Sequence, residues 1–161
     1  MRVAFACGIE IAAPPARIHA ELAAPERQLG LQPLLIEVVP LAAAPADPPG
    51  VRRFEAVERV PLFGRVALRN RIRVTVRPDP EGRFVDFHAR SRGAVEVRSR
   101  FALEPCAGGT RVREDVALRV PRWLRRFVEP RAVAAQAALL ANLKQRLEAE
   151  AARAASPEKT G

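Results

Sequence analysis

The fold is decided by the stretch PRWLRRFVEPRAVAAQAALLANLKQRLEAEA, residues 121–151. It is the only long segment of the chain without glycine. Its apolar side chains recur at helical steps of three, four and seven residues: Val133, Leu140, Leu143 and Leu147. This spacing predicts one long helix with an apolar stripe along one face.

Two features of this stretch bear on how the helix packs. Pro130 lacks the N–H of a helical hydrogen bond, and its ring clashes with the preceding turn. Residues 122–128 are therefore a separate turn, or the helix kinks at Glu129–Pro130, or Pro130 is the first residue of the main helix. Alanine is frequent over residues 132–141. Small side chains facing a concave sheet leave volume unfilled, although helix propensity alone also explains them.

Upstream of this helix, apolar and polar residues alternate with the period of two that is typical of half-buried strands. The pattern predicts a strand at 3–11, two short helices at 16–23 and 25–29, and strands at 34–39, 52–60, 65–77, 83–90, 94–103 and 110–120. Hairpin strands with a terminal helix make an α+β domain. We expect a curved seven-stranded antiparallel sheet wrapped around the C-terminal helix. Residues 1–151 form the single predicted domain, and residues 152–161 a disordered tail.

Composition limits the function classes. No run approaches the roughly 18 apolar residues of a membrane span. Glu10 interrupts the apolar N-terminus and argues against an export signal. Cys7 and Cys106 are the only cysteines, too few for a disulfide framework, so we expect a cytoplasmic protein. No Cys/His spacing resembles a metal site, and we expect neither a metal nor a cofactor.

The formal net charge of +9 comes almost entirely from arginine. A basic surface attracts nucleic acid or anionic lipid. Because no nucleic-acid motif accompanies the charge, nucleic acid is not the expected partner. Peripheral contact with an anionic membrane stays open, and so does the oligomeric state. A coding sequence rich in G and C also explains the abundance of Arg, Ala, Pro and Gly.

Several segments together resemble the START-like, helix-grip superfamily of polyketide cyclases, lipid-transfer proteins and plant allergens of the Bet v type. The resemblance spans about residues 1–150. It is carried by IAAPPARI at 11–18, RFVDF at 83–87, FALEP at 101–105, GGTRV at 108–112, Pro121 and NLKQRLE at 142–148. It implies a cavity between the helix and the sheet. It leaves activity open, since members bind, carry or catalyse.

Polar residues on apolar strand faces are the candidates for chemistry, because burying them is costly without a partner. They are Asn70, Ser99, Glu114 and the pair Asp86 and His88. A carboxylate in an apolar pocket has a raised pKa and acts as a general acid or base, and a histidine held by an aspartate does the same. Two alternatives stay open. In the first, Glu114 pairs with Arg98 or Arg100 of a neighbouring strand. In the second, Val85, Phe87 and Ala89 form the buried face of residues 83–90, which places Asp86 and His88 outside.

The first function hypothesis is a non-catalytic carrier of an apolar small molecule such as a lipid, polyketide or isoprenoid. The predicted ligand contacts are Val66, Leu68, Asn70, Ile72, Val97, Ser99, Phe101, Val116, Trp123 and Phe127. The second is an enzyme of the cyclase or dehydratase type using Glu114, Asp86 or His88. The third is an interaction module that works through its basic surface.

Overall fold

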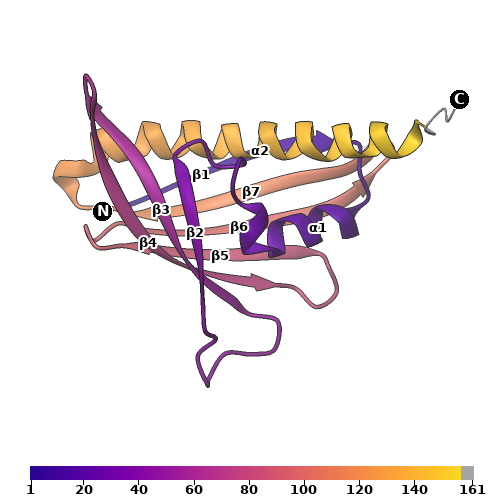
Figure 1. Ribbon diagram of the computed structural model, residues 1–161, viewed down its shortest axis with the longest axis horizontal. Coiled ribbons are helices and arrows are strands. Elements are labelled where there is room, and N and C mark those ends of the chain that lie inside the picture. The colour runs from indigo at the N-terminus through magenta and orange to yellow at the C-terminus, as the bar shows by residue number, and fades with distance from the viewer. Residues whose placement is uncertain (157–161) are drawn as a thin grey trace, which may run out of the picture.

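The computed structural model describes residues 1–156 of the 161-residue chain, without the side chains of residues 62 and 63. The strands are β1 (Arg2–Ile11), β2 (Leu35–Leu41), β3 (Arg52–Phe63), β4 (Val66–Pro78), β5 (Phe84–Ser91), β6 (Glu96–Cys106) and β7 (Gly109–Arg119). The helices are α1 (Pro15–Ala23), α2 (Arg125–Ala155) and the short 3-10 helices η1 (Pro25–Arg27) and η2 (Arg122–Leu124). Figure 1 shows their arrangement.

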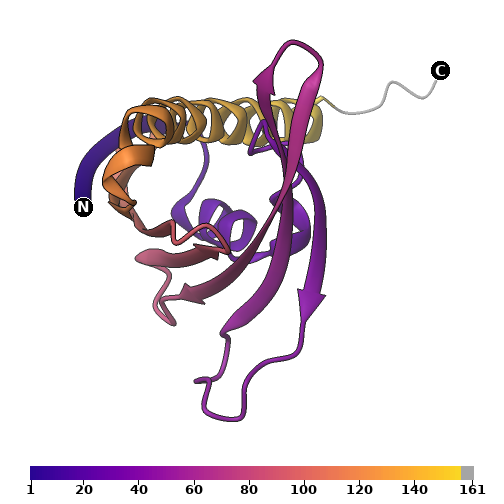
Figure 2. The same cartoon turned by 90° about the vertical axis from the view of Figure 1, so that its left-hand side faces the viewer.

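The seven strands form one antiparallel sheet in the order β1-β7-β6-β5-β4-β3-β2. It curves beneath α2, which lies along one side of it (Figures 1 and 2). The predicted α+β architecture of a curved seven-stranded sheet gripping a C-terminal helix is therefore confirmed. The two short helices predicted after the first strand correspond to α1 and η1.

The long helix differs from its prediction at both ends. Pro130 lies inside α2, which begins at Arg125 after the 3-10 turn η2, so Pro130 is not the first residue of the helix. Pro130 is the sixth residue of α2, so its missing N–H removes one hydrogen bond, to the carbonyl of Arg126 in the first turns of the helix. The helix continues through Ala155, so residues 152–155, predicted as part of a disordered tail, belong to α2. Residues 157–161 of that tail lie outside the described residues. No described helix has the length and apolarity to cross a membrane.

The main core fills only one end of the space between sheet and helix. Leu140, Leu143 and Leu147 of α2 pack with Ile18 and Leu22 of α1 and with the sheet. At this end, on the right of Figure 1, α1 lies within the concave side of the sheet. Among the described residues, no helix lies beneath the first half of α2. This asymmetry positions the site described next.

The β6–β7 turn locks the start of α1 to the sheet. Gly109 adopts φ 135°, and a Cβ there would collide with the carbonyl oxygen of Ile11. Only glycine allows this approach of the two backbones. The Thr110 hydroxyl, fully buried, donates a 2.7 Å hydrogen bond to the carbonyl of Ala13. The sequence GGT at 108–110 is thus a structural anchor for the β1–α1 connection.

Candidate functional site

A groove of about 740 Å³ lies between the sheet and the first half of α2. We call it the inner groove. Its floor is the concave side of β3, β4, β5 and β6, and its roof is α2 from Phe127 to Leu139. Apolar side chains dominate the wall, among them Phe54, Ile72 and Phe87. The volume is within the range of about 300–1,000 Å³ typical of small-molecule sites.

The alanines of α2 contribute to this open volume. Ala132 and Ala135 both lie in the groove wall, one turn apart on the same side of the helix. Leu139, the next residue on this side, is buried in the main core. The spatial explanation for the alanines therefore applies to these two. Ala134, Ala137 and Ala141 are instead exposed, and there helix propensity is sufficient explanation.

Seven of the ten residues predicted to contact ligand lie in the wall of the inner groove. They are Leu68, Asn70, Ile72, Val97, Ser99, Phe101 and Phe127. Their contact with a ligand stays a prediction. Val66 is 52% exposed near the tip of the β3–β4 hairpin, beyond the groove. Val116 is buried between β1 and β6, where its register partners are Phe5 and Ser99.

Trp123 is not part of the inner groove wall. Its side chain is 80% exposed on η2, and its predicted contact with a ligand stays a prediction. A spacing of four residues would place Trp123 and Phe127 on the same side of a regular α-helix. Because η2 has the tighter winding of a 3-10 helix, the two side chains diverge.

Glu58 is the functional candidate that sequence reasoning missed. It lies in the groove wall with Asn70, its register partner across β3 and β4. Burial raises the pKa of the Glu58 carboxyl above its usual 4.5, and a hydrogen bond from Asn70 offsets part of this. The signal was present in the sequence, because Phe54, Ala56, Glu58 and Val60 share one strand parity. Glu58 is a polar residue on an apolar face, as Asn70 is.

Glu114 is fully buried beneath the groove and is not part of its wall. Burial raises its pKa from 4.5 to about 7, and the neighbouring Cys7 and Ser99 side chains offset this only in part. The Cys7 thiol lies 3.5 Å from Oε2, while Oε1 has no hydrogen-bond partner among the described residues. The cross-strand pairing of Glu114 with Arg98 or Arg100 was a wrong prediction, because both arginines point to the opposite face.

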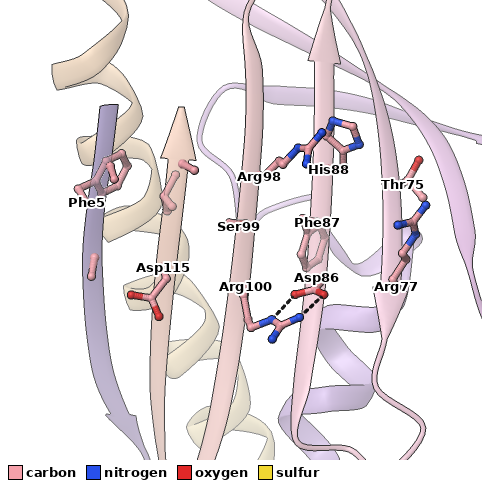
Figure 3. A pocket seen from close by; sticks show the side chains of 14 residues that line it. Phe5, Thr75, Arg77, Asp86, Phe87, His88, Arg98, Ser99, Arg100 and Asp115 are labelled. Carbon is pink, nitrogen blue, oxygen red and sulfur yellow. Dashed lines mark hydrogen bonds and ion pairs between the residues drawn. The ribbon is translucent and has the colours of Figure 1, made fainter. Parts of the chain in front are cut away.

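Asp86 and His88 lie on the face of the sheet away from α2, so they do not contact the inner groove. The alternative is correct: Val85 is buried, and Phe87 and Ala89 face the groove. Figure 3 shows the surface that Asp86 and His88 do line, an open groove of about 800 Å³ that we call the outer groove. This position removes both residues as acid or base for a ligand in the inner groove.

Asp86 and His88 each have a polar partner on this face of the sheet. Asp86 receives two hydrogen bonds from Arg100, at 2.6 and 2.7 Å (Figure 3). His88 Nε2 lies 2.6 Å from Oε1 of Glu96, which also accepts from Arg98 at 3.0 Å. These partners, His88 first, lower the pKa of Glu96 to about 2. Asp86 and His88 are thus held by Arg100 and Glu96 on the outer face of the sheet.

The inner groove therefore offers apolar contact together with a few polar groups. Glu58 and Asn70 are neighbours across β3 and β4, and Gln32 Nε2 donates to Gln136 Oε1 at 3.5 Å. Arg131 adds a cation at the roof, but its guanidinium lies 3.6 Å over the ring of Phe127 and donates to that residue's carbonyl. Within residues 1–156, no group of three His, Cys, Asp or Glu side chains is placed to hold a metal.

Comparison with known proteins agrees with this geometry. Residues 3–148 match the family model described as polyketide cyclase/dehydrase and lipid transport. No curated protein matches the sequence. The Zhui aromatase/cyclase of a Streptomyces species superposes with a TM-score of 0.72 at 14% identity, covering 92% of this chain and 94% of that one. A protein from Thermus thermophilus gives a TM-score of 0.71 at 19% identity, covering 97% of this chain and 100% of that one.

A di-domain aromatase/cyclase from the steffimycin biosynthetic pathway gives a TM-score of 0.74 at 11% identity, covering 94% of this chain. This chain spans about half of that protein, at 52% of its length. Structural similarity at 11–19% sequence identity shows only that the fold is shared. The family model, in contrast, matches the sequence itself over residues 3–148. The chain belongs to the polyketide cyclase/dehydrase and lipid transport family of the START-like, helix-grip superfamily.

Proposed function

We propose that this protein binds or carries a hydrophobic small molecule of the lipid, polyketide or isoprenoid kind in the inner groove. The observation that carries the proposal is the apolar volume left under α2, where Ala132 and Ala135 face the sheet. Transferring apolar ligand surface into such a space contributes about 25 cal/mol per Å². Membership in a family that includes lipid transport supports the same conclusion.

The groove also favours one orientation of its ligand. Glu58 and Asn70 are the polar pair on its floor, and most of their surroundings are apolar. A ligand hydroxyl or amine can donate to the Glu58 carboxylate, and a carbonyl can accept from it once it is protonated. Burying such a group without this partner is costly. We therefore propose an amphipathic ligand with its hydrogen-bonding group at Glu58 and its apolar body along α2.

A titration with cis-parinaric acid, a fluorescent fatty acid, tests the proposal. Ala135→Phe places a ring in the groove and should weaken binding strongly. Ala137→Phe makes the same change on the exposed side of α2 and should leave binding unchanged. Thermal melts of both variants confirm that they are folded. Equal binding by wild type and Ala135→Phe, or no binding by wild type, would contradict the proposal.

A second candidate function is acid–base catalysis on the bound ligand, and Glu58 favours it. Burial raises the pKa of the Glu58 carboxyl, and a carboxyl shifted in this direction is better suited to act as a general acid toward a bound ligand. Two of the structural neighbours carry aromatase/cyclase names. Glu58→Gln tests this role. For a catalyst, the variant loses turnover of a bound polyketide but still binds it; for a carrier, wild type and variant both return the ligand unchanged.

A further inference from the structure

One end of the sheet gathers segments that are distant in the sequence. Because the sheet is antiparallel, the N-terminus, the β3–β4 and β5–β6 turns and the β7–η2 connection lie at the same end of their strands, spaced around the curve of the sheet. This end lies on the left in Figure 1 and faces the viewer in Figure 2. We call it the mouth end, comprising residues 1–2, 64–68, 91–95 and 122–126. The wall of the inner groove reaches it at Leu68, Gly93 and Leu124.

The mouth end exposes large apolar side chains. Trp123 is 80% exposed, Leu68 is 55% exposed, Val66 is 52% exposed and Met1 is 51% exposed. Several such side chains at one end of a molecule mark an interaction surface. Tryptophan in particular favours the interface between membrane and water, where its ring is buried and its N–H stays hydrated.

The same end is strongly cationic. Its arginines without an ion-pair partner among the described residues are Arg2, Arg65, Arg92, Arg122 and Arg126. Two carboxylates close to these arginines in the sequence are already engaged. Glu96 lies within ion-pair distance of Arg90, Arg98 and Arg119. Glu129 is bound by Arg125 at 2.7 Å.

Arginines elsewhere on the molecule are of both kinds, since Arg52 and Arg153 also have no ion-pair partner among the described residues. What sets the mouth end apart is that its unpaired arginines accompany the four most exposed large apolar side chains of the described chain. Arg53 and Arg83, away from the mouth end, are neutralised by Asp47 and Asp79 at 2.6 and 2.9 Å. Positive charge without local neutralisation, placed beside exposed apolar side chains, matches a surface that is both anionic and apolar. An RNA would satisfy the charge but not Val66, Leu68 and Met1. A bilayer with anionic headgroups satisfies both.

We propose that the mouth end docks on an anionic phospholipid surface, with Trp123 at the level of the headgroups. The inner groove would then open toward the bilayer, which makes the membrane the source or destination of its ligand. That second part rests on the proposed function. Docking itself needs only the mouth end, so the two proposals can fail separately.

Trp123 is the only tryptophan, so its own fluorescence reports docking. Its emission should shift to shorter wavelength with vesicles of phosphatidylcholine mixed with phosphatidylglycerol, and stay unchanged with pure phosphatidylcholine. Each arginine near an anionic surface contributes about five-fold to binding. Arg122→Glu with Arg126→Glu should therefore weaken vesicle binding by roughly thirty-fold or more. Added salt should weaken wild-type binding as well.

The matched control is Arg52→Glu with Arg153→Glu, which changes the net charge equally on exposed residues outside the mouth end. It should retain most of the vesicle binding. Equal losses in the two double variants would overturn the proposal, because the net positive charge of the whole protein would then be sufficient to explain its binding to anionic vesicles. So would absence of wild-type binding to anionic vesicles, or binding to single-stranded RNA in its place.

Parinaric acid binding separates this proposal from the proposed function. Arg122, Trp123 and Arg126 do not line the inner groove, so Trp123→Ala and the double variant should bind the probe as wild type does. Probe binding without vesicle binding refutes docking and leaves the groove intact. Vesicle binding without probe binding supports docking and refutes the ligand-binding function.

Discussion

Replacing Glu114 by glutamine should change how the stability of the protein depends on pH. In the folded protein, burial raises the pKa of this carboxyl from 4.5 to about 7. Between these two values, the unfolded chain has released the proton while the folded protein retains it. The free energy of unfolding therefore falls as pH rises through this window.

The magnitude follows from the two pKa values. Each pH unit of the window is worth about 1.4 kcal/mol, so Glu114 removes roughly 3 kcal/mol of unfolding free energy between pH 4.5 and 7. Below pH 4.5 both states are protonated and the effect vanishes. Glutamine keeps the shape but cannot ionise. We expect Glu114→Gln to exceed wild type in stability at pH 8, by up to roughly 3 kcal/mol, and to lose this advantage near pH 4.5.

Urea unfolding at several pH values measures this difference directly. Glu104→Gln is the matched control, since it makes the same chemical change on a carboxylate that is 74% exposed on β6. Its stability relative to wild type should vary little with pH. The reasoning is refuted if the difference between Glu114→Gln and wild type is constant with pH, or if glutamine lowers stability at pH 8.

Three further predictions concern the sheet and the helix. Leu143→Ala removes a fully buried side chain of α2 and should cost about 2–5 kcal/mol in urea unfolding, whereas Ala137→Ser on the exposed side should cost little. Gly109→Ala should lower the melting temperature, because its Cβ collides with the Ile11 carbonyl; Gly108→Ala, which meets nothing within 4 Å, should be mild. Glu96→Gln should lower stability at pH 7 and match wild type near pH 2, because the depressed pKa of Glu96 gives stability that is lost on acidification through about 2. Thermal melts across this pH range check it, and a constant difference would contradict it.

The fold was predictable because its periodicities are local. Residues 65–77 alternate so strictly that a register slip would exchange core residues for arginine. The same alternation indicated that Leu68, Asn70 and Ile72 share a face, and all three lie in the inner groove wall. Residues 83–90 offered two apolar faces, so alternation alone could not place Asp86 and His88.

The differences from prediction arise where position along an element decides exposure. Val66 has the same parity as Ile72, yet it extends past the sheet's cover and is exposed. Trp123 precedes α2 in a short 3-10 turn, where the helical spacing to Phe127 does not apply. An apolar repeat of two or four residues indicates neither where the cover of the sheet ends nor where the α-helix begins. Glu58, in contrast, was detectable by the parity rule that selected Asn70.

The account as a whole depends on whether the inner groove holds a guest. Native mass spectrometry of the protein purified from its own host tests this most directly. We predict a species heavier than the bare chain by the mass of one small molecule, which disappears on denaturation and is absent in Ala135→Phe. The bare mass alone in every wild-type preparation would contradict the claim.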